Sequence, residues 1–193
     1  MRGILIFMEI SYLGNTGYRI KSKSGVVVIN PGSEKSTADI AITTDRNGEV
    51  GGVKGTSRRK EPFVISEPGE YEVESISIFG YGSSSKNTIY VVQTDDLRVA
   101  HLGKLESEFD KKLLDKLKGV DVLMIPVSDA GIEDKKLVEL VGEIEPVYIV
   151  PMGSKDESKK IIELLGKTVN EVDSLSINKA TLPIDLSEVV VFE

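Results

Sequence analysis

The spacing of apolar residues changes near the middle of the chain, and this change most limits the folds available to it. Up to about residue 102, apolar residues lie in short runs rich in Val, Ile, Tyr and Phe, which are typical of β-strands. Gly, Pro, Asn and Ser separate the runs. The sequence predicts strands over Ile4–Ile10, Tyr18–Lys21, Val26–Asn30, Ile40–Thr44, Phe63–Ser66, Tyr71–Phe79, Thr88–Gln93 and Arg98–Leu102.

The second half of the chain has the period of helices. Three stretches place apolar residues three or four positions apart, the spacing of one helical face. Residues typical of helix ends delimit them: Ser107-x-x-Asp110 before the first, Pro146 after the second, and Ser154-x-x-Glu157 and Gly166 around the third. The residues expected to face a sheet are Leu113, Leu117, Leu137, Val141, Ile161 and Leu165. Further strands are expected over Val122–Pro126, Val147–Val150 and Val189–Phe192.

These elements predict an α/β fold in one domain. The chain has 193 residues, enough to bury a sizeable core. It contains no internal repeat and no linker long enough to separate two domains. Antiparallel strands followed by alternating helices and strands indicate layered sheets with helices on the outside.

Composition excludes some classes of function. The formal net charge is −7, which argues against binding nucleic acid or an anionic membrane, since both require a basic face. The chain has no cysteine, so it has neither disulfides nor thiolate metal ligands. The apolar run Ile4–Phe7 is too short for a signal peptide or a membrane span, because Glu9 follows it. We therefore expect a cytoplasmic protein.

Several stretches, taken in order, resemble a known family. The stretches are YLGNTGYRIK (12–21), VVINP (27–31), ADIAITT (38–44), FVISEPGEYEV (63–73), SKNTIYVV (85–92), LRVAHLGKL (97–105), DVLMIPV (121–127) and IEPVYIVPM (144–152). With them the chain resembles, from about Met8 to the C-terminus, the small lactonase-like prokaryotic members of the metallo-β-lactamase-fold hydrolases. The order and spacing of the stretches carry the resemblance more than any one stretch does.

The resemblance implies an αββα sandwich of two mixed β-sheets flanked by helices. It implies a single domain over residues 1–193, with residues 1–7 an extension of the family core. In active members a binuclear metal centre at one edge generates a hydroxide nucleophile. Its ligands come from an H-x-H-x-D-H loop, a later His, an Asp after His-Leu-Gly, and a last His after Ile-Pro-Met.

Other residues occupy the corresponding positions of this chain. Asp45 and Asn47 stand where the first two histidines belong, and Glu49 stands where the Asp of that loop belongs. Val50 takes the place of the third histidine, and Gly80–Ser85 contains no later one. The bridging Asp is Lys104 and the final His is Gly153. Asn15 stands where family members often carry a His. From these replacements we expect a degenerate site without zinc, and no cofactor.

His101 is the only histidine in the chain, and it falls at the His of His-Leu-Gly, which is not a metal ligand in the family. A lone histidine at a strand end is more often a hydrogen-bonded structural residue than a catalytic base. We expect His101 to be structural and assign no catalytic residue.

Two hypotheses for function follow. The first is a non-catalytic pseudoenzyme that acts as a binding module, scaffold or subunit of a homo-oligomer, with an unidentified small molecule or protein as partner. The second is a hydrolase with altered, non-zinc chemistry, which would use Lys104, His101 and the carboxylates of Asp45 and Glu49. The ammonium of Lys104 counts against the second, because it would repel a cation in the same cavity.

The replacement of an acid by Lys104 yields a sharper prediction. Loss of metal charge leaves the ligand carboxylates facing one another, and an ammonium would relieve that repulsion. We expect the ammonium of Lys104 to pair with Asp45, Glu49 or both.

Overall fold

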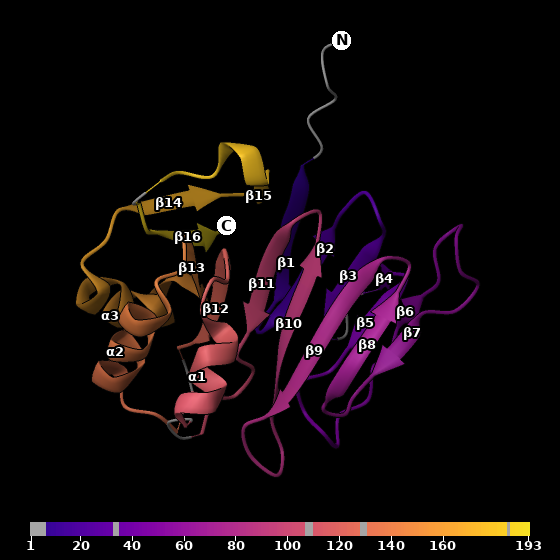
Figure 1. Ribbon diagram of the computed structural model, residues 1–193, viewed down its shortest axis with the longest axis horizontal. Helices are drawn as coiled ribbons and strands as arrows, with labels where there is room; N and C mark the ends of the chain where they lie inside the picture. Colours follow the sequence, from indigo (N-terminus) through magenta and orange to yellow (C-terminus); the bar gives the residue numbers. More distant parts are fainter. Residues whose placement is uncertain (1–6, 33–34, 107–109, 128–130, 185) are drawn as a thin grey trace.

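Two β-sheets face each other and form the centre of the molecule (Figure 1). The computed structural model describes residues 7–32, 35–106, 110–127, 131–184 and 186–193. This architecture confirms the metallo-β-lactamase-like α/β sandwich expected from the sequence. The assignment of all 193 residues to one domain, with residues 1–7 as an extension, stays a prediction.

The first sheet has six strands in the order β15-β1-β2-β3-β5-β7. Strand β1 pairs antiparallel with both β15 and β2, and β2 pairs antiparallel with β3. Strand β5 pairs in parallel with its two neighbours, β3 and β7. The strands are β1 (Met8–Gly14), β2 (Gly17–Lys21), β3 (Val26–Ile29), β5 (Ile40–Ile42), β7 (Phe63–Ile65) and β15 (Ser174–Ile177). In the described part of the chain the predicted strand Ile4–Ile10 starts at Met8, and it continues beyond its predicted end. A separate two-stranded sheet pairs β4 (Ser36–Thr37) with β6 (Val53–Lys54).

The second sheet has eight strands in the order β14-β16-β13-β12-β11-β10-β9-β8. The strands from β11 to β14 pair in parallel, and β8, β9 and β10 form antiparallel hairpins. The strands are β8 (Gly69–Val73), β9 (Ile76–Gly82), β10 (Thr88–Thr94), β11 (Leu97–His101), β12 (Val122–Pro126), β13 (Tyr148–Met152), β14 (Val169–Val172) and β16 (Glu188–Phe192).

The predicted single strand Tyr71–Phe79 is wrong. The chain turns back within it at Glu74 and Ser75, which both have positive φ, so that β8 and β9 form a hairpin. Neither residue is a Gly or an Asn, the residue types that usually mark such a turn. The sequence also missed β14 and β15, whose exposed positions are mostly polar.

The three helices are α1 (Lys111–Leu117), α2 (Asp134–Ile144) and α3 (Lys155–Leu165), and a short 3₁₀ helix η1 spans Lys179–Thr181. The predicted ends of α2 and α3 are confirmed: α2 ends before Pro146, and α3 begins with the capping box of Ser154 and Glu157. Asp110 caps α1, whereas the predicted Ser107 lies outside the described residues.

All three helices cover the eight-stranded sheet. Their apolar faces join that sheet in one cluster, in which Leu117, Leu137, Val141 and Ile161 are buried and Leu113 and Leu165 pack at the margin. This packing confirms the predicted orientation of the helices. None of the described helices is long and apolar enough to cross a membrane.

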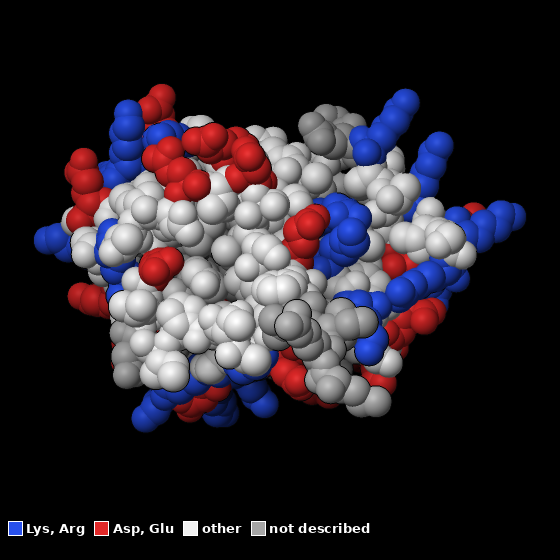
Figure 2. Space-filling model, turned by 90° about the horizontal axis from the view of Figure 1, so that it is seen from above, with Lys and Arg blue, Asp and Glu red and all other residues white. Residues whose placement is uncertain are grey.

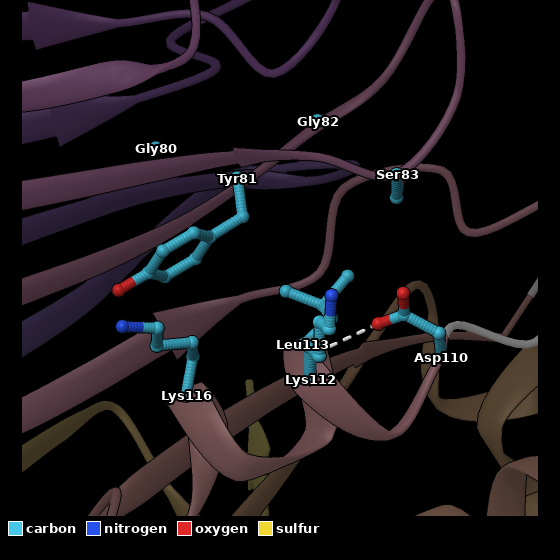
Figure 3. Close-up of a pocket in the computed structure, with 8 residues that line it drawn as sticks. All are labelled: Gly80, Tyr81, Gly82, Ser83, Asp110, Lys112, Leu113 and Lys116. Atoms are coloured by element: carbon cyan, nitrogen blue, oxygen red, sulfur yellow. Dashed lines mark hydrogen bonds between the residues drawn. The ribbon is translucent and has the colours of Figure 1, made fainter.

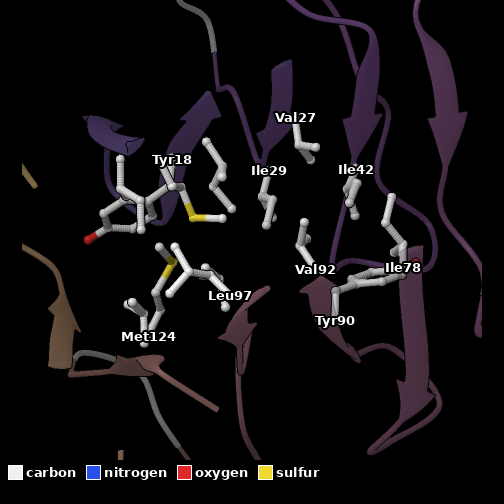
Figure 4. Close-up of a cluster of buried hydrophobic side chains, with 14 of the residues drawn as sticks. Tyr18, Val27, Ile29, Ile42, Ile78, Tyr90, Val92, Leu97 and Met124 are labelled. Carbon is white, nitrogen blue, oxygen red and sulfur yellow. The ribbon is translucent and has the colours of Figure 1, made fainter. Parts of the chain in front are cut away.

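A second cluster fills the space between the two sheets (Figure 4). Tyr18 and Tyr90 are its largest fully buried side chains. The hydroxyl of Tyr90 donates to the carbonyl of Glu67 at 3.1 Å, so its polar end is satisfied. Burial raises the pKa of both tyrosines above the usual value, and both stay protonated.

Within each sheet the parallel strands run in the same direction. Their N-terminal ends therefore lie together at one edge, and their C-terminal ends lie together at the opposite edge. Asp39 precedes β5 and Asp121 precedes β12, and both are almost fully buried. The carboxylate of Asp39 accepts from the backbone N–H of Val26 at 2.8 Å and from the hydroxyl of Thr56. Asp121 accepts from the backbone N–H of Arg98 at 2.8 Å and from the ammonium of Lys179 at 2.6 Å. These carboxylates hold strand starts in place.

Figure 2 looks down on the end of the molecule at which β1 starts. Basic side chains project at its right-hand end and acidic ones gather at its upper left. Both signs of charge therefore share this face.

Candidate functional site

The positions that match the family's ligands follow the C-terminal ends of strands or occupy the turns beside them. Asp45, Asn47 and Glu49 come after β5, Lys104 follows β11, and Gly153 follows β13. Asn15 lies in the turn between β1 and β2. Ligands in open α/β sheets bind at the carboxyl ends of strands. This edge is therefore the candidate functional site.

His101 is the last residue of β11 and is fully buried. Its Nδ1 accepts from the backbone N–H of Gly103 at 3.1 Å, so the proton of the neutral ring sits on Nε2 and is donated to the carbonyl of Thr16 at 2.9 Å. The ring also lies edge-on to Tyr18, with centroids 6.1 Å apart. Burial lowers the pKa of His101 to about 4, although the hydrogen bond to the carbonyl of Thr16 opposes the shift. The structure places His101 between the two sheets, as a neutral link with both ring nitrogens engaged.

Asn87 is the central polar residue of this edge and is 3% exposed. Its amide nitrogen donates to Ser83 Oγ at 2.8 Å and to the carbonyl of Leu102 at 3.0 Å. Its amide oxygen accepts from the backbone N–H of Lys104 at 2.9 Å. The backbone of Asn87 also forms an isolated β-bridge with Asp45. One carboxamide therefore ties together the loops that follow β9 and β11, and its main chain joins both to the loop after β5.

Gly103 shows how closely this network is packed. It has φ +61°, and a Cβ added there would lie 2.2 Å from the amide oxygen of Asn87. Glycine meets both needs, because it adopts positive φ easily and has no Cβ that would clash with Asn87.

Asn30 plays the matching part in the six-stranded sheet. Its amide nitrogen donates to Thr16 Oγ1 at 3.1 Å and to Thr44 Oγ1 at 2.9 Å, and its amide oxygen accepts from the backbone N–H of Thr44 at 2.9 Å. The carbonyl of Thr44 in turn accepts from the N–H of Thr88 in the other sheet, at 2.9 Å. The polar groups at this edge therefore bond mainly to the protein itself.

The charged and polar residues in front of this network are exposed. Asp45, Asn47 and Glu49 all point to the surface, and Asp45 Oδ1 accepts only from the backbone N–H of Asn47, at 3.0 Å. Glu49 and Asn15 line one pocket of about 420 Å³. Its other polar groups come from Thr16, Asn30 and Thr43.

Lys104 does not behave as the sequence predicts. Its side chain is exposed, and within the described residues its ammonium has no carboxylate within 4.0 Å. The predicted ion pair of Lys104 with Asp45 or Glu49 is therefore wrong. Only the backbone of Lys104 is fixed, by Asn87, while water solvates the ammonium at little cost.

Gly153 follows β13 and leads into α3. A Cβ at this position would approach Val127 Cγ2 to 2.5 Å, and Glu157 Oε2 lies 3.2 Å from it. That carboxylate accepts from the backbone N–H and the hydroxyl of Ser154, both at 2.7 Å. Gly153 therefore makes room for the helix start of α3.

The donor set does not fit a zinc or iron centre. No group of three or more His, Cys, Asp or Glu side chains that could hold a metal ion occurs among the residues described. Asp45 and Glu49 are the only acids at the mapped positions, and transition metals prefer imidazole, thiolate or a denser set of carboxylates.

The sequence itself matches a family model. The model is that of the beta-lactamase superfamily domain, and the match covers residues 9–153. The chain belongs to this superfamily. The matched region runs from β1 to the end of β13 and so contains every candidate position named above, which confirms the resemblance found in the sequence. No curated protein matches the chain significantly in sequence.

Solved structures share the superfamily fold over almost the whole chain. A candidate Zn-dependent hydrolase of the metallo-β-lactamase superfamily from Thermotoga maritima has a TM-score of 0.82 and 23% identity, covering 96% of this chain and 98% of its own. A metallo hydrolase from the archaeon Ignicoccus hospitalis has a TM-score of 0.62 and 13% identity, covering 89% and 99%. A diiron β-hydroxylase from Streptomyces venezuelae has a TM-score of 0.53 and 10% identity, covering 83% and 50%. At these identities the similarity shows the fold alone.

These structures correct one expectation. The sequence predicts a protein with no cofactor, whereas the three similar structures are those of a candidate zinc enzyme, a metallo hydrolase and a diiron enzyme. The prediction that the protein has no cofactor, made from the replaced ligand residues, is therefore contradicted by its structural neighbours.

Proposed function

We propose that this superfamily member is a non-catalytic binding protein, a pseudoenzyme whose loop edge holds a partner without hydrolysing it. One observation carries the proposal: the buried Asn87 and His101 and the partly buried Asn30 have the hydrogen-bonding groups of their side chains engaged within the protein. Catalytic acid–base groups need a free atom within reach of the substrate. Here the buried groups stabilise the loops instead.

The alternative, a hydrolase with altered chemistry, would use His101, Lys104 and the carboxylates of Asp45 and Glu49. The complete burial of His101 counts against it, because the ring contacts only the protein. The exposure of Lys104 counts against it too, because its side chain lies at the surface and is not among the residues that line the pocket of Asn15 and Glu49.

The pocket beside Asn15 and Glu49 supports binding. Its volume of about 420 Å³ falls in the range of small-molecule sites. Amide, hydroxyl and carboxylate groups reach it from three loops. A polar small molecule is the partner that these groups suit best. The cytoplasmic location, oligomeric state and absence of membrane or nucleic-acid partners stay predictions.

Hydrolysis assays test the proposal. Purified protein is offered lactone, phosphodiester, thioester and β-lactam substrates, both as isolated and with added Zn²⁺, Fe²⁺ or Mn²⁺. We expect no turnover above background in any condition. Turnover that disappears in Lys104→Ala or Glu49→Ala, but persists in the control Lys21→Ala at the far end of β2, would establish an enzyme and reject the proposal.

A further inference from the structure

A second pocket, of about 520 Å³, lies between strand β9 and helix α1 (Figure 3). Side chains line it from two sides: Tyr81 and Ser83 from the strand, and Asp110, Lys112, Leu113 and Lys116 from the helix. Figure 3 shows Lys112, Leu113 and Lys116 rising from α1 toward the strand that carries Tyr81. We propose that this pocket binds a small phosphorylated molecule with a planar body. The inference goes beyond the proposed function, because none of these residues lines the pocket of Asn15 and Glu49.

The charges in the pocket favour an anion. Lys112 and Lys116 are one helical turn apart, and within the described residues neither ammonium has a carboxylate within 4.0 Å. Asp110 is the one carboxylate among the described residues that line the pocket, and it accepts from the backbone N–H of Leu113 at 2.9 Å. Two ammonium groups match the two negative charges of a phosphate monoester, for which lysine is a frequent ligand.

The lysine-bearing helix is held at both ends, so the two ammonium groups start from a fixed backbone. Asp110 caps the N-terminus of α1. At the other end the guanidinium of Arg98, on β11, donates to the carbonyls of Lys116 at 2.9 Å and Lys118 at 2.6 Å. Fixing the helix in advance lowers the entropic cost of binding.

The remaining walls favour a planar body. The ring of Tyr81 and the side chain of Leu113 present partly buried apolar surface on opposite sides of the pocket. The volume suits a molecule larger than free phosphate. Ser83 offers a hydroxyl at the rim. Since Ser83 also accepts from Asn87, this pocket adjoins the network of the loop edge.

Phenyl phosphate is a suitable probe, because it combines a dianion with an aromatic ring. Titration into ¹⁵N-labelled full-length protein at constant ionic strength should shift the amide signals of residues 81–83 and 110–116. We expect Lys112→Ala and Lys116→Ala each to weaken binding about tenfold, the loss of one charge-assisted hydrogen bond. Lys111→Ala is the matched control, since it removes the same charge from the same helix but lies outside this pocket.

Three further probes separate the contributions. Inorganic phosphate has only the charge and phenol only the ring, so each should bind at least tenfold more weakly than phenyl phosphate. Benzoate has a ring and a single negative charge, so its affinity should lie between that of phenyl phosphate and those of the other two probes. An amide spectrum of each variant shows whether it is folded. The proposal is wrong if phenyl phosphate causes no shifts, if the shifts spread over lysines elsewhere on the surface, or if Lys111→Ala weakens binding as much as Lys116→Ala.

Discussion

Acidic side chains occur at both ends of the parallel strands, and they do different things at each end. Before the strands, Asp39 and Asp121 are buried and accept backbone N–H groups. After the strands, Asp45 and Glu49 are exposed, and the neutral amides of the buried Asn87 and the partly buried Asn30 lie behind them. At the N-terminal ends of the strands, charged carboxylates bind the loops through hydrogen bonds. At the C-terminal ends, where the candidate site lies, the neutral amides of Asn30 and Asn87 do so.

This difference predicts which of the acidic positions tolerate substitution. A carboxylate that is buried and bonded to backbone donors cannot be removed without leaving those donors unsatisfied. An exposed carboxylate that closes only a local turn can change freely. The site end can therefore lose or gain charged side chains while its amide network keeps the loops in place.

The largest effect should come from the buried carboxylates. We expect Asp39→Ala to lower the free energy of unfolding by about 3 kcal/mol, because the N–H of Val26 and the hydroxyl of Thr56 lose a charged partner. Urea denaturation measures the change. The matched control Asp45→Ala should change stability by less than about 0.5 kcal/mol. Equal losses in the two variants would remove the distinction between the ends.

The amide network should come next. We expect Asn87→Ala to cost about 2 kcal/mol, since the carbonyl of Leu102 and the N–H of Lys104 are left without their partner. Asn47→Ala, at an exposed position of the same edge, is the control. A stable Asn87→Ala variant with an unchanged amide spectrum around residues 102–104 would show that the network is not needed.

The pH dependence of stability should follow from His101. Its pKa is lowered to about 4 in the folded protein, against an ordinary 6.5, so between these values the unfolded chain binds the extra proton. Stability therefore rises with pH, and this contribution is lost as the pH falls from above 6.5 through 4. Between pH 7 and pH 5 the loss should be about 2 kcal/mol.

Two measurements isolate this term. The chain has one histidine, so its ring signals in an NMR titration are unambiguous. They should report a neutral ring with the proton on Nε2 down to about pH 5. In His101→Gln the stability difference between pH 7 and pH 5 should shrink by the same amount. A ring that titrates near 6.5 would contradict the burial of His101.

The smallest effect should come from Lys104. The variants Lys104→Ala and Asp45→Ala should each change stability by less than about 0.5 kcal/mol, because both side chains are exposed. In a double-mutant cycle their coupling should be zero within about 0.3 kcal/mol. A larger coupling would restore the ion pair that the sequence suggested.

The sequence predicted helix boundaries correctly where a proline or a capping residue sets them. Pro146 stops α2, and Ser154 with Glu157 starts α3, because these residues act on the backbone a few positions away. The hairpin at Glu74 and Ser75 escaped prediction, since nothing in those residue types indicates positive φ.

The site was less predictable than the fold. The order of the matched stretches located the edge, but it did not reveal Asn87, whose partners lie 15 and 17 positions further along the chain. A single Asn after Ser and Lys carries no periodic signal. The direction of the Lys104 side chain was also beyond prediction, because exposed lysines have many rotamers of similar energy.

The turn at Gly103 and Lys104 has a consequence for the motions of the site. Both backbone N–H groups lie outside any strand, yet His101 and Asn87 accept them. Local opening of this turn would therefore have to break hydrogen bonds to two buried side chains, and such events are rare. Amide exchange here should be as slow as in a strand, while the side chains of Asp45, Glu49 and Lys104 reorient in picoseconds to nanoseconds. A partner that contacts Gly103 and Lys104 would meet a backbone already held by His101 and Asn87, beside charged side chains that reorient quickly.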